Sequence, residues 1–120
     1  MALTSHRLIG DGMNVIGSRP DGWWRDRRGA MRRLVDALEK VDDFDHVVVV
    51  LDGKAFDLAS ERVEVRFASR RGPNAADDDI AAIAREVDTV VTSDADLERR
   101  VRERGADVLG AGAFRRRLDD

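Results

Sequence analysis

The sequence predicts an α/β domain of three layers, in which helices cover both faces of a central, mostly parallel sheet. Continuous apolar runs, typical of strands that are buried on both faces, recur along the chain. Stretches with the three- and four-residue apolar spacing of a helix separate these runs. At 120 residues the chain can form one hydrophobic core but not two, so we expect residues 1–120 to be a single domain.

Five short segments are expected to form strands. The run "RLIGD" ends at Asp11, "HVVVVLDG" ends near Asp52, and "VDTVVTSD" ends at Asp94. "RVEVRF" alternates apolar and charged residues, which suits a strand with one exposed face, and "ADVLG" is expected to be a short last strand. With the helices, this gives the order β-α-β-(β)-α-β-α-β of a doubly wound sheet.

Apolar stripes predict three helices between these strands. The stripes consist of Met31, Leu34, Val35 and Leu38 in the first helix, Ile80, Ile83, Ala84 and Val87 in the second, and Leu97 and Val101 in the third. Gly105 lies where a C-terminal cap of the third helix is expected.

The composition excludes several classes of site. The chain has no cysteine, which excludes disulfides, thiolate metal sites and a cysteine nucleophile. Its two histidines, His6 and His46, are too few for a multi-histidine zinc site and lie before their strands, so we expect them to be structural. With 21 basic and 24 acidic residues, the chain is not a general polycation. We find no signal peptide and no apolar run of membrane-spanning length, and expect a soluble, cytoplasmic protein without a membrane partner.

Aspartates follow three of the expected parallel strands. Asp11 follows the first strand, Asp52 the second, and Asp94 and Asp96 the fourth. Because parallel strands deliver their carboxyl ends to one edge of the sheet, these acids are expected to meet there. A run of three further aspartates, residues 77–79, opens the helix that leads into the fourth strand and is expected near the same edge.

Clustered carboxylates repel one another, and a hard divalent cation relieves this repulsion. Mg²⁺ and Mn²⁺ prefer oxygen ligands and can activate water for attack on a phosphodiester. Each acid also has a purely structural interpretation. Asp11 and Asp52 suit turns, Asp94 suits a helix N-cap, and one or two of the acids at 77–79 suit the positive end of a helix dipole. These interpretations do not require all the acids to share one edge.

Four blocks, "RLIGDGMNVI", "VVVVLDG", "AADDDIAAIA" and "VVTSDADLERRVRERGA", resemble in order those of the NYN group of PIN-like nucleases, and within it the YacP-like branch. The last two blocks also resemble the metal-binding blocks of the related 5′-nuclease superfamily. The resemblance covers roughly residues 7 to 110. It implies a PIN-like α/β/α fold and metal-dependent cleavage of RNA.

Carried over residue by residue, the resemblance implies a catalytic set of Asp11, Asp77 and Asp94. It implies that the metal ligands are Asp11, Asp77, Asp78, Asp94 and Asp96. Asp52 matches an aspartate common in the YacP-like block and is a further candidate, whereas Asp79 falls on a variable position. Ala75 stands where 5′-nucleases often have a glutamate, so we expect one tightly held Mg²⁺ or Mn²⁺, with a second recruited by substrate.

Other side chains are expected on the substrate side of the site. Asn14 and Ser93 come from the matched blocks, and Arg70 and Arg71 from the loop before the acidic helix start. Arg28 belongs to "WWRDRR", residues 23–28, which mixes aromatic and cationic side chains in a way that suits stacking on unpaired bases. The alternatives are a solvated loop for the arginines and packing for the tryptophans, with one tryptophan buried and the other partly exposed. The basic run "FRRRL", residues 114–118, is either a phosphate contact or a solvated face.

The favoured function is an Mg²⁺- or Mn²⁺-dependent endoribonuclease that cleaves single-stranded RNA through a metal-activated water. The alternative is a catalytically weak RNA-binding adaptor on the same fold. A small-molecule phosphatase fits less well, because "DGMNV" lacks the second aspartate of a D-x-D motif. Expected partners are RNA and a ribosome or RNA-processing complex, and the oligomeric state, monomer or homodimer, is left open.

Overall fold

The structure is a computed structural model that describes residues 6–72 and 74–119. Both ends of the expected domain, residues 1–5 and 120, lie outside the described residues. Within the described part, no helix is long and apolar enough to cross a membrane.

The central sheet has five strands, and all its pairings are parallel. The strands are β1 (Arg7–Asp11), β2 (His46–Leu51), β3 (Val63–Phe67), β4 (Asp88–Val91) and β5 (Asp107–Leu109). Their order across the sheet is β3-β2-β1-β4-β5. The prediction of a mostly parallel α/β sheet is therefore confirmed, and the five expected strands are all present.

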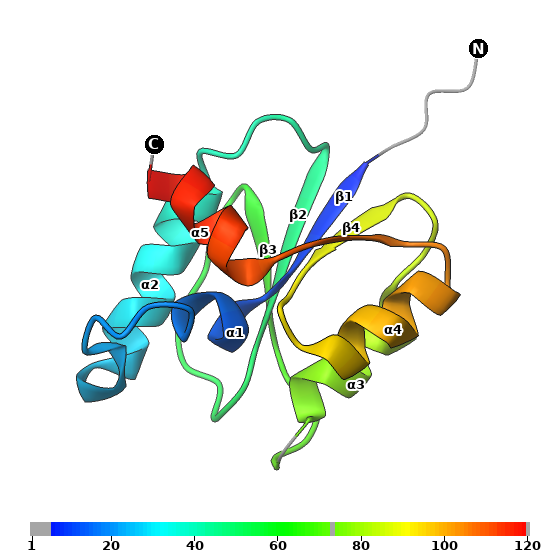
Figure 1. The fold of residues 1–120 in the computed structure, drawn as a ribbon. Helices are drawn as coiled ribbons and strands as arrows, with labels where there is room; N and C mark the ends of the chain where they lie inside the picture. The colour runs from blue at the N-terminus through cyan, green and yellow to red at the C-terminus, as the bar shows by residue number, and fades with distance from the viewer. Residues whose placement is uncertain (1–5, 73, 120) are drawn as a thin grey trace.

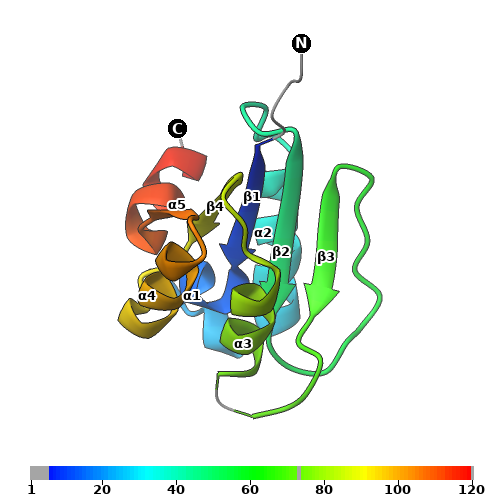
Figure 2. The same ribbon diagram turned by 90° about the vertical axis from the view of Figure 1, so that its right-hand side faces the viewer.

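Helices cover both faces of the sheet, as Figures 1 and 2 show. One face carries α1 (Gly12–Ile16), α2 (Arg27–Leu38) and α5 (Ala111–Asp119), and the short 3-10 helix η1 (Trp23–Arg25) precedes α2. The other face carries α3 (Ala75–Ile83) and α4 (Ala95–Glu103). The architecture has the three expected layers.

Alternate residues of the buried strands feed two separate cores. In β2, Val47, Val49 and Leu51 pack toward α1, α2 and α5, whereas Val48 and Val50 pack toward α3 and α4. All five side chains are fully buried. The run is continuous in sequence because successive side chains of a strand point to opposite faces, and here both faces are covered.

The strand order reverses beside β1. The chain moves from β1 to β2 and β3 on one side, and then crosses to β4 and β5 on the other. The carboxyl ends of β1 and β4 therefore flank a switch point, where open α/β sheets bind ligands. This is the edge at which the sequence predicted the acids to meet.

The helices differ from the sequence predictions in three places. Helix α3 ends at Ile83, Ala84 is already extended, and Val87 is exposed, so Val87 does not extend the apolar stripe. Helices α1 and α5 were not predicted. For α5, the signal was the spacing of Ala111, Phe114 and Leu118, because Phe114 is fully buried and Leu118 packs on the same core.

Gly105 ends α4, as predicted. Its φ is +90°, a left-handed conformation that glycine adopts at little cost. The backbone N–H of Ala106 donates to the carbonyl of Val101 at 3.1 Å, which closes the C-terminal turn.

A buried ion pair lies at the amino edge of the sheet, opposite the acidic edge. The carboxylate of Asp88 is 1% exposed and accepts hydrogen bonds from Arg7 Nε at 2.8 Å, from Arg7 Nη2 at 2.7 Å and from the backbone N–H of Arg85 at 2.8 Å. Arg7 also donates to the carbonyl of Ile83 at 2.8 Å. The pair therefore ties β1 and β4 to the end of α3.

Candidate acidic site at the carboxyl edge of the sheet

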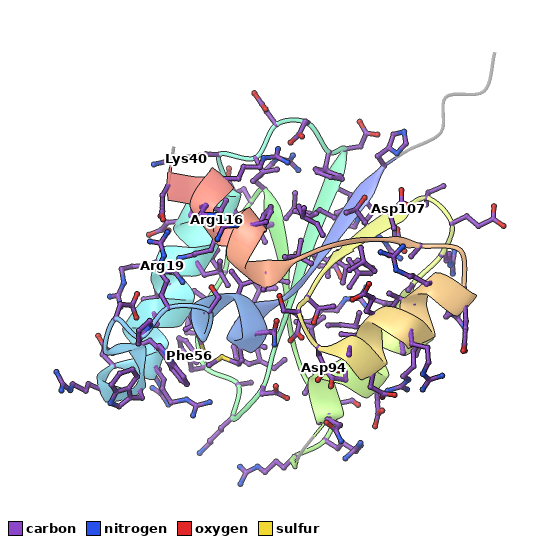
Figure 3. The ribbon with its side chains drawn as sticks, viewed as in Figure 1. Arg19, Lys40, Phe56, Asp94, Asp107 and Arg116 are labelled. Carbon is purple, nitrogen blue, oxygen red and sulfur yellow. The ribbon has the colours of Figure 1, made fainter. Side chains whose placement is uncertain are left out.

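Four aspartates gather at the carboxyl edge, each placed by a different element. Asp11 is the last residue of β1, Asp52 follows β2, Asp77 lies in the first turn of α3, and Asp94 is the N-cap of α4. Figure 3 shows Asp94 at the start of α4, at the end of the sheet toward which the strand arrows point. We call these four residues the acidic cluster.

Asp11 is the most deeply buried member of the acidic cluster. Its residue is 4% exposed, and its Oδ2 accepts a hydrogen bond from the hydroxyl of Thr92 at 2.9 Å. Burial, followed by the charges of Asp77, Asp52 and Asp94, raises the pKa of Asp11 to about 7, despite the opposing effect of Thr92. Near neutral pH this carboxyl group is therefore poised between its two charge states.

Asp77 is shifted in the same direction. Burial, followed by the charges of Asp94 and Asp52, raises the pKa of Asp77, and Arg100 opposes the rise. Asp52 and Asp94 therefore lie near enough to both Asp11 and Asp77 for their charges to disfavour ionisation of those two carboxyl groups. The convergence inferred from strand order is thus observed for four of the acids.

Two members of the acidic cluster also cap helices. Asp94 Oδ1 accepts from the backbone N–H of Leu97 at 3.0 Å, the side-chain cap of α4. Asp52 Oδ1 accepts from the backbone N–H of Ala76 at 3.1 Å and so caps α3 from outside, because Asn74 makes no side-chain cap of its own. The structural interpretation of Asp94 as a cap is therefore correct, and it coexists with membership of the cluster.

Thr92 connects two members of the cluster. Its side chain is buried, its hydroxyl donates to Asp11, and its Oγ1 accepts from the backbone N–H of Asp94 at 3.1 Å. Sequence reasoning did not single out Thr92. The signal that could have identified Thr92 is its position directly before "SDAD", at the end of a strand. A hydroxyl at that point can form hydrogen bonds with residues at the end of the neighbouring strand.

Asn14 and Ser93 lie beside the cluster and link its loops. Asn14 Oδ1 accepts from the backbone N–H of Ser93 at 2.7 Å, and Ser93 Oγ accepts from the backbone N–H of Ala111 at 2.9 Å. These bonds join α1, the loop after β4 and the start of α5. Contact of either side chain with substrate stays a prediction.

Two expected metal ligands point elsewhere. Asp78 forms ion pairs with Arg70 and with Arg100, the latter at 2.9 Å, and their hydrogen bonds, that of Arg100 first, lower the pKa of Asp78. Asp96 pairs with Arg99 at 2.7 Å on the outer surface of α4, and its side chain is 66% exposed. The structure therefore does not bring Asp78 or Asp96 into the acidic cluster, and their role as ligands stays a prediction.

Asp79, expected to be the spare acid of its run, anchors a loop. Its carboxylate accepts from the backbone N–H of Ser69 at 2.6 Å and from the Ser69 hydroxyl at 2.7 Å. These bonds hold the loop that carries Arg70 and Arg71 against α3. Arg71 is exposed. The guanidinium carbon of Arg28 lies 4.8 Å from the centre of the Phe56 ring, so Arg28 faces the loop after β2, which carries Phe56.

The prediction for the tryptophans is wrong in one respect, because neither ring is buried. Trp23 is partly buried against the core on the α2 side, and Trp24 is 52% exposed. Adjacent positions on one short helical turn cannot both reach the core, and here Trp23 contacts the edge of the core whereas Trp24 points away from it.

The donor set of the acidic cluster suits a hard divalent cation. Asp11 has no cationic partner among the described residues, and burial together with the charges of Asp52 and Asp94 raises the pKa values of Asp11 and Asp77. Such an oxygen-rich environment is the kind that Mg²⁺ and Mn²⁺ prefer. Ala75 is buried at the start of α3 and adds no side-chain oxygen. In the described part of the chain, no three acidic or histidine side chains are arranged closely enough to hold a metal ion as they stand.

Replacing Thr92 by Val is expected to destabilise the protein by about 1–3 kcal/mol, because Asp11 loses its donor and the Asp94 N–H loses its acceptor. The loss should be larger at pH 8 than at pH 5, since the hydroxyl favours the charged form of Asp11. Urea unfolding at the two pH values measures this. Thr92→Ser keeps the hydroxyl and is the control; equal losses in both variants would contradict the assignment.

Comparisons with known proteins bear on the fold. No family model matches the chain, and no curated protein does. The structure is similar to crystal structures of Rae1 (YacP) from Bacillus subtilis. For a tryptophan-to-leucine mutant of that protein, the TM-score is 0.76 at 25% sequence identity, over 95% of this chain and 75% of that one. A second structure gives a TM-score of 0.73 at 25% identity, over 93% and 72% of the two chains. The chain therefore has a YacP-like α/β fold.

Proposed function

We propose that this protein is a metal-dependent ribonuclease whose active site is the acidic cluster. The observation that carries the proposal is the gathering of Asp11, Asp52, Asp77 and Asp94 at the switch point of a parallel sheet. The YacP-like fold supports it, since the sequence blocks that resemble the YacP-like branch of NYN nucleases are those that bear these acids.

Within this proposal, Asp11, Asp77 and Asp94 would hold Mg²⁺ or Mn²⁺, with Asp52 beside them. The ion would supply positive charge for the phosphodiester and would activate an attacking water. Thr92 fixes the orientation of Asp11, and the caps made by Asp52 and Asp94 fix the starts of α3 and α4. The protein's own contribution is thus a rigid arrangement of carboxylates that is electrostatically unfavourable until a cation binds.

The test is cleavage of an unstructured RNA with Mg²⁺ or Mn²⁺. Asp94→Asn is expected to lower the rate roughly a hundredfold, because asparagine keeps the cap of α4 but removes the charge. Asp107→Asn removes the same charge at the amino edge and should cleave like the wild type; Figure 3 shows Asp107 far from Asp94. Equal activity in the wild type and Asp94→Asn would refute the proposal.

The substrate form separates two modes of action. A circular single-stranded RNA has no ends, so its cleavage would establish the endonucleolytic mode that we propose. If only the linear form is degraded, the enzyme is an exonuclease. Association with a ribosome or an RNA-processing complex stays a prediction.

One observation favours a second candidate, an RNA-binding adaptor on the same fold. The described acids do not by themselves form a ready ligand set for a metal. Metal-independent RNA binding without cleavage under either metal would establish this alternative.

A further inference from the structure

A groove with cationic walls begins at the acidic cluster. Its volume is about 430 Å³, and Arg27, Lys54, Arg70 and Arg71 line it together with Asp52. Asp52 also belongs to the acidic cluster. The groove therefore leads from the acids to the start of α2.

Most of the cationic groups in this groove are available to a ligand. Arg27, Lys54 and Arg71 form no ion pair with any acid in the described ranges 6–72 and 74–119, and all three are exposed. Arg70, by contrast, is paired with Asp78. Three uncompensated cations on a chain of net charge −3 form a local positive surface that suits a polyanion.

Aromatic rings continue this surface beyond Arg27. The Arg27 guanidinium lies 5.6 Å from the centre of the Trp23 ring, and Trp23 meets Trp24 edge to face at 5.9 Å. Arg25 lies over the Trp24 ring at 5.9 Å. Trp24 is 52% exposed and belongs to neither core, so the packing of the fold does not account for it.

We propose that this surface holds an unpaired segment of RNA, with phosphates along Arg27, Lys54 and Arg71 and a base stacked on Trp24. The inference rests on the proposed function for the identity of the polyanion. Charge alone would suit an acidic peptide, but an exposed indole flanked by arginines suits the face of a base. A duplex keeps its bases stacked inside, so the surface selects single strands.

The test is binding, measured in EDTA so that cleavage plays no part. The probe is a fluorescently labelled, unstructured RNA of about a dozen nucleotides, a length within the usual site size of single-strand-binding surfaces. Its binding is compared with that of the same sequence as a duplex. The wild type is expected to bind the single strand more tightly. Trp24→Ala should weaken that binding about five- to a hundredfold, whereas Trp24→Phe, which keeps an aromatic face, should retain most of it.

The two lysines of the chain provide a matched pair of charge variants. Lys54→Gln should weaken binding and make the slope of log K against log salt shallower by about 0.7, the value of one phosphate contact on a single strand. Lys40→Gln should leave both unchanged, because Lys40 follows the far end of α2; Figure 3 shows it distant from Phe56 and Asp94.

Equal affinity for single strand and duplex, or an unchanged affinity of Trp24→Ala, would overturn the inference. So would polyglutamate binding that depends on Trp24 as strongly as RNA binding does. Trp24-dependent RNA binding without cleavage would overturn the proposed function and support this inference. Cleavage by Trp24→Ala with an unchanged KM would support the function and overturn the inference.

Discussion

The Asp11→Asn variant is expected to be more stable than the wild type at pH 8 and to lose RNA cleavage. In the folded protein the pKa of Asp11 is about 7, against 3.8 for an unperturbed aspartate. Between these values the folded state binds more protons than the unfolded state, so the wild type loses stability as the pH rises through this window. Asparagine cannot ionise and still accepts the Thr92 hydrogen bond, so the variant avoids this loss.

The size of the effect follows from the shift in pKa. Each unit corresponds to about 1.4 kcal/mol, so the variant should gain roughly 2–4 kcal/mol at pH 8 and little at pH 4. This corresponds to an increase in Tm of about 10 °C for a domain of this size. Thermal unfolding of both proteins between pH 4 and pH 8 measures it. A difference in stability that does not change with pH would contradict the burial argument.

Divalent metal should offset most of the stability advantage of Asp11→Asn at pH 8. At a concentration of Mg²⁺ or Mn²⁺ a hundred times Kd, a ligand that binds only the folded state stabilises it by about 2.7 kcal/mol. We expect this in the wild type at pH 8 but not in Asp11→Asn, together with a loss of cleavage of about a thousandfold. Asp107→Asn is the charge control. A metal response in Asp11→Asn equal to that of the wild type would show that the ion binds elsewhere.

Breaking the Arg7–Asp88 pair is expected to have the largest effect on folding. Among the described residues, Arg7→Ala leaves the buried Asp88 carboxylate with the backbone N–H of Arg85 as its one donor, and should lower the free energy of unfolding by about 3–5 kcal/mol. Arg99→Ala removes a guanidinium from exposed pairs on α4 and should cost less than about 1 kcal/mol. Urea unfolding compares them.

The double variant Arg7→Ala with Asp88→Ala tests the pairing itself. If the cost of Arg7→Ala comes from an isolated buried charge, removing Asp88 as well should restore part of the lost stability. Additive losses in the double variant would show that the two side chains act independently. Where Arg7→Ala proves too unstable to purify, Arg7→Lys keeps the charge and allows the comparison.

The sequence predicted those features that depend on backbone periodicity. The run of valines in β2 indicated a strand buried on both faces, and parallel strands implied that Asp11, Asp52 and Asp94 would meet at one edge. These follow from the geometry of the chain alone, so no knowledge of the neighbours was needed.

The sequence could not predict features that depend on where a side chain finds its partner. Asp77 and Asp78 are adjacent in one motif, yet Asp77 faces the acids while Asp78 meets Arg100 on α4 and Arg70 in a loop. Adjacent helix positions point about a quarter-turn apart. The ion pairs with Arg70 and Arg100 hold Asp78 away from the cluster, and the sequence does not show where these two guanidinium groups lie. Thr92 was missed for the same reason, since it follows β4 and its hydroxyl bonds to Asp11 at the end of the neighbouring strand β1.

The two ends of β1 have opposite electrostatic character. Arg7 neutralises a buried acid at one end, while Asp11 stands among like charges at the other, four residues and roughly 13 Å along the strand. An engineer can therefore reinforce the amino edge first and randomise the carboxyl edge afterwards. New substrate preferences could be selected in such a library while the Arg7–Asp88 pair, which is not varied, continues to stabilise the fold.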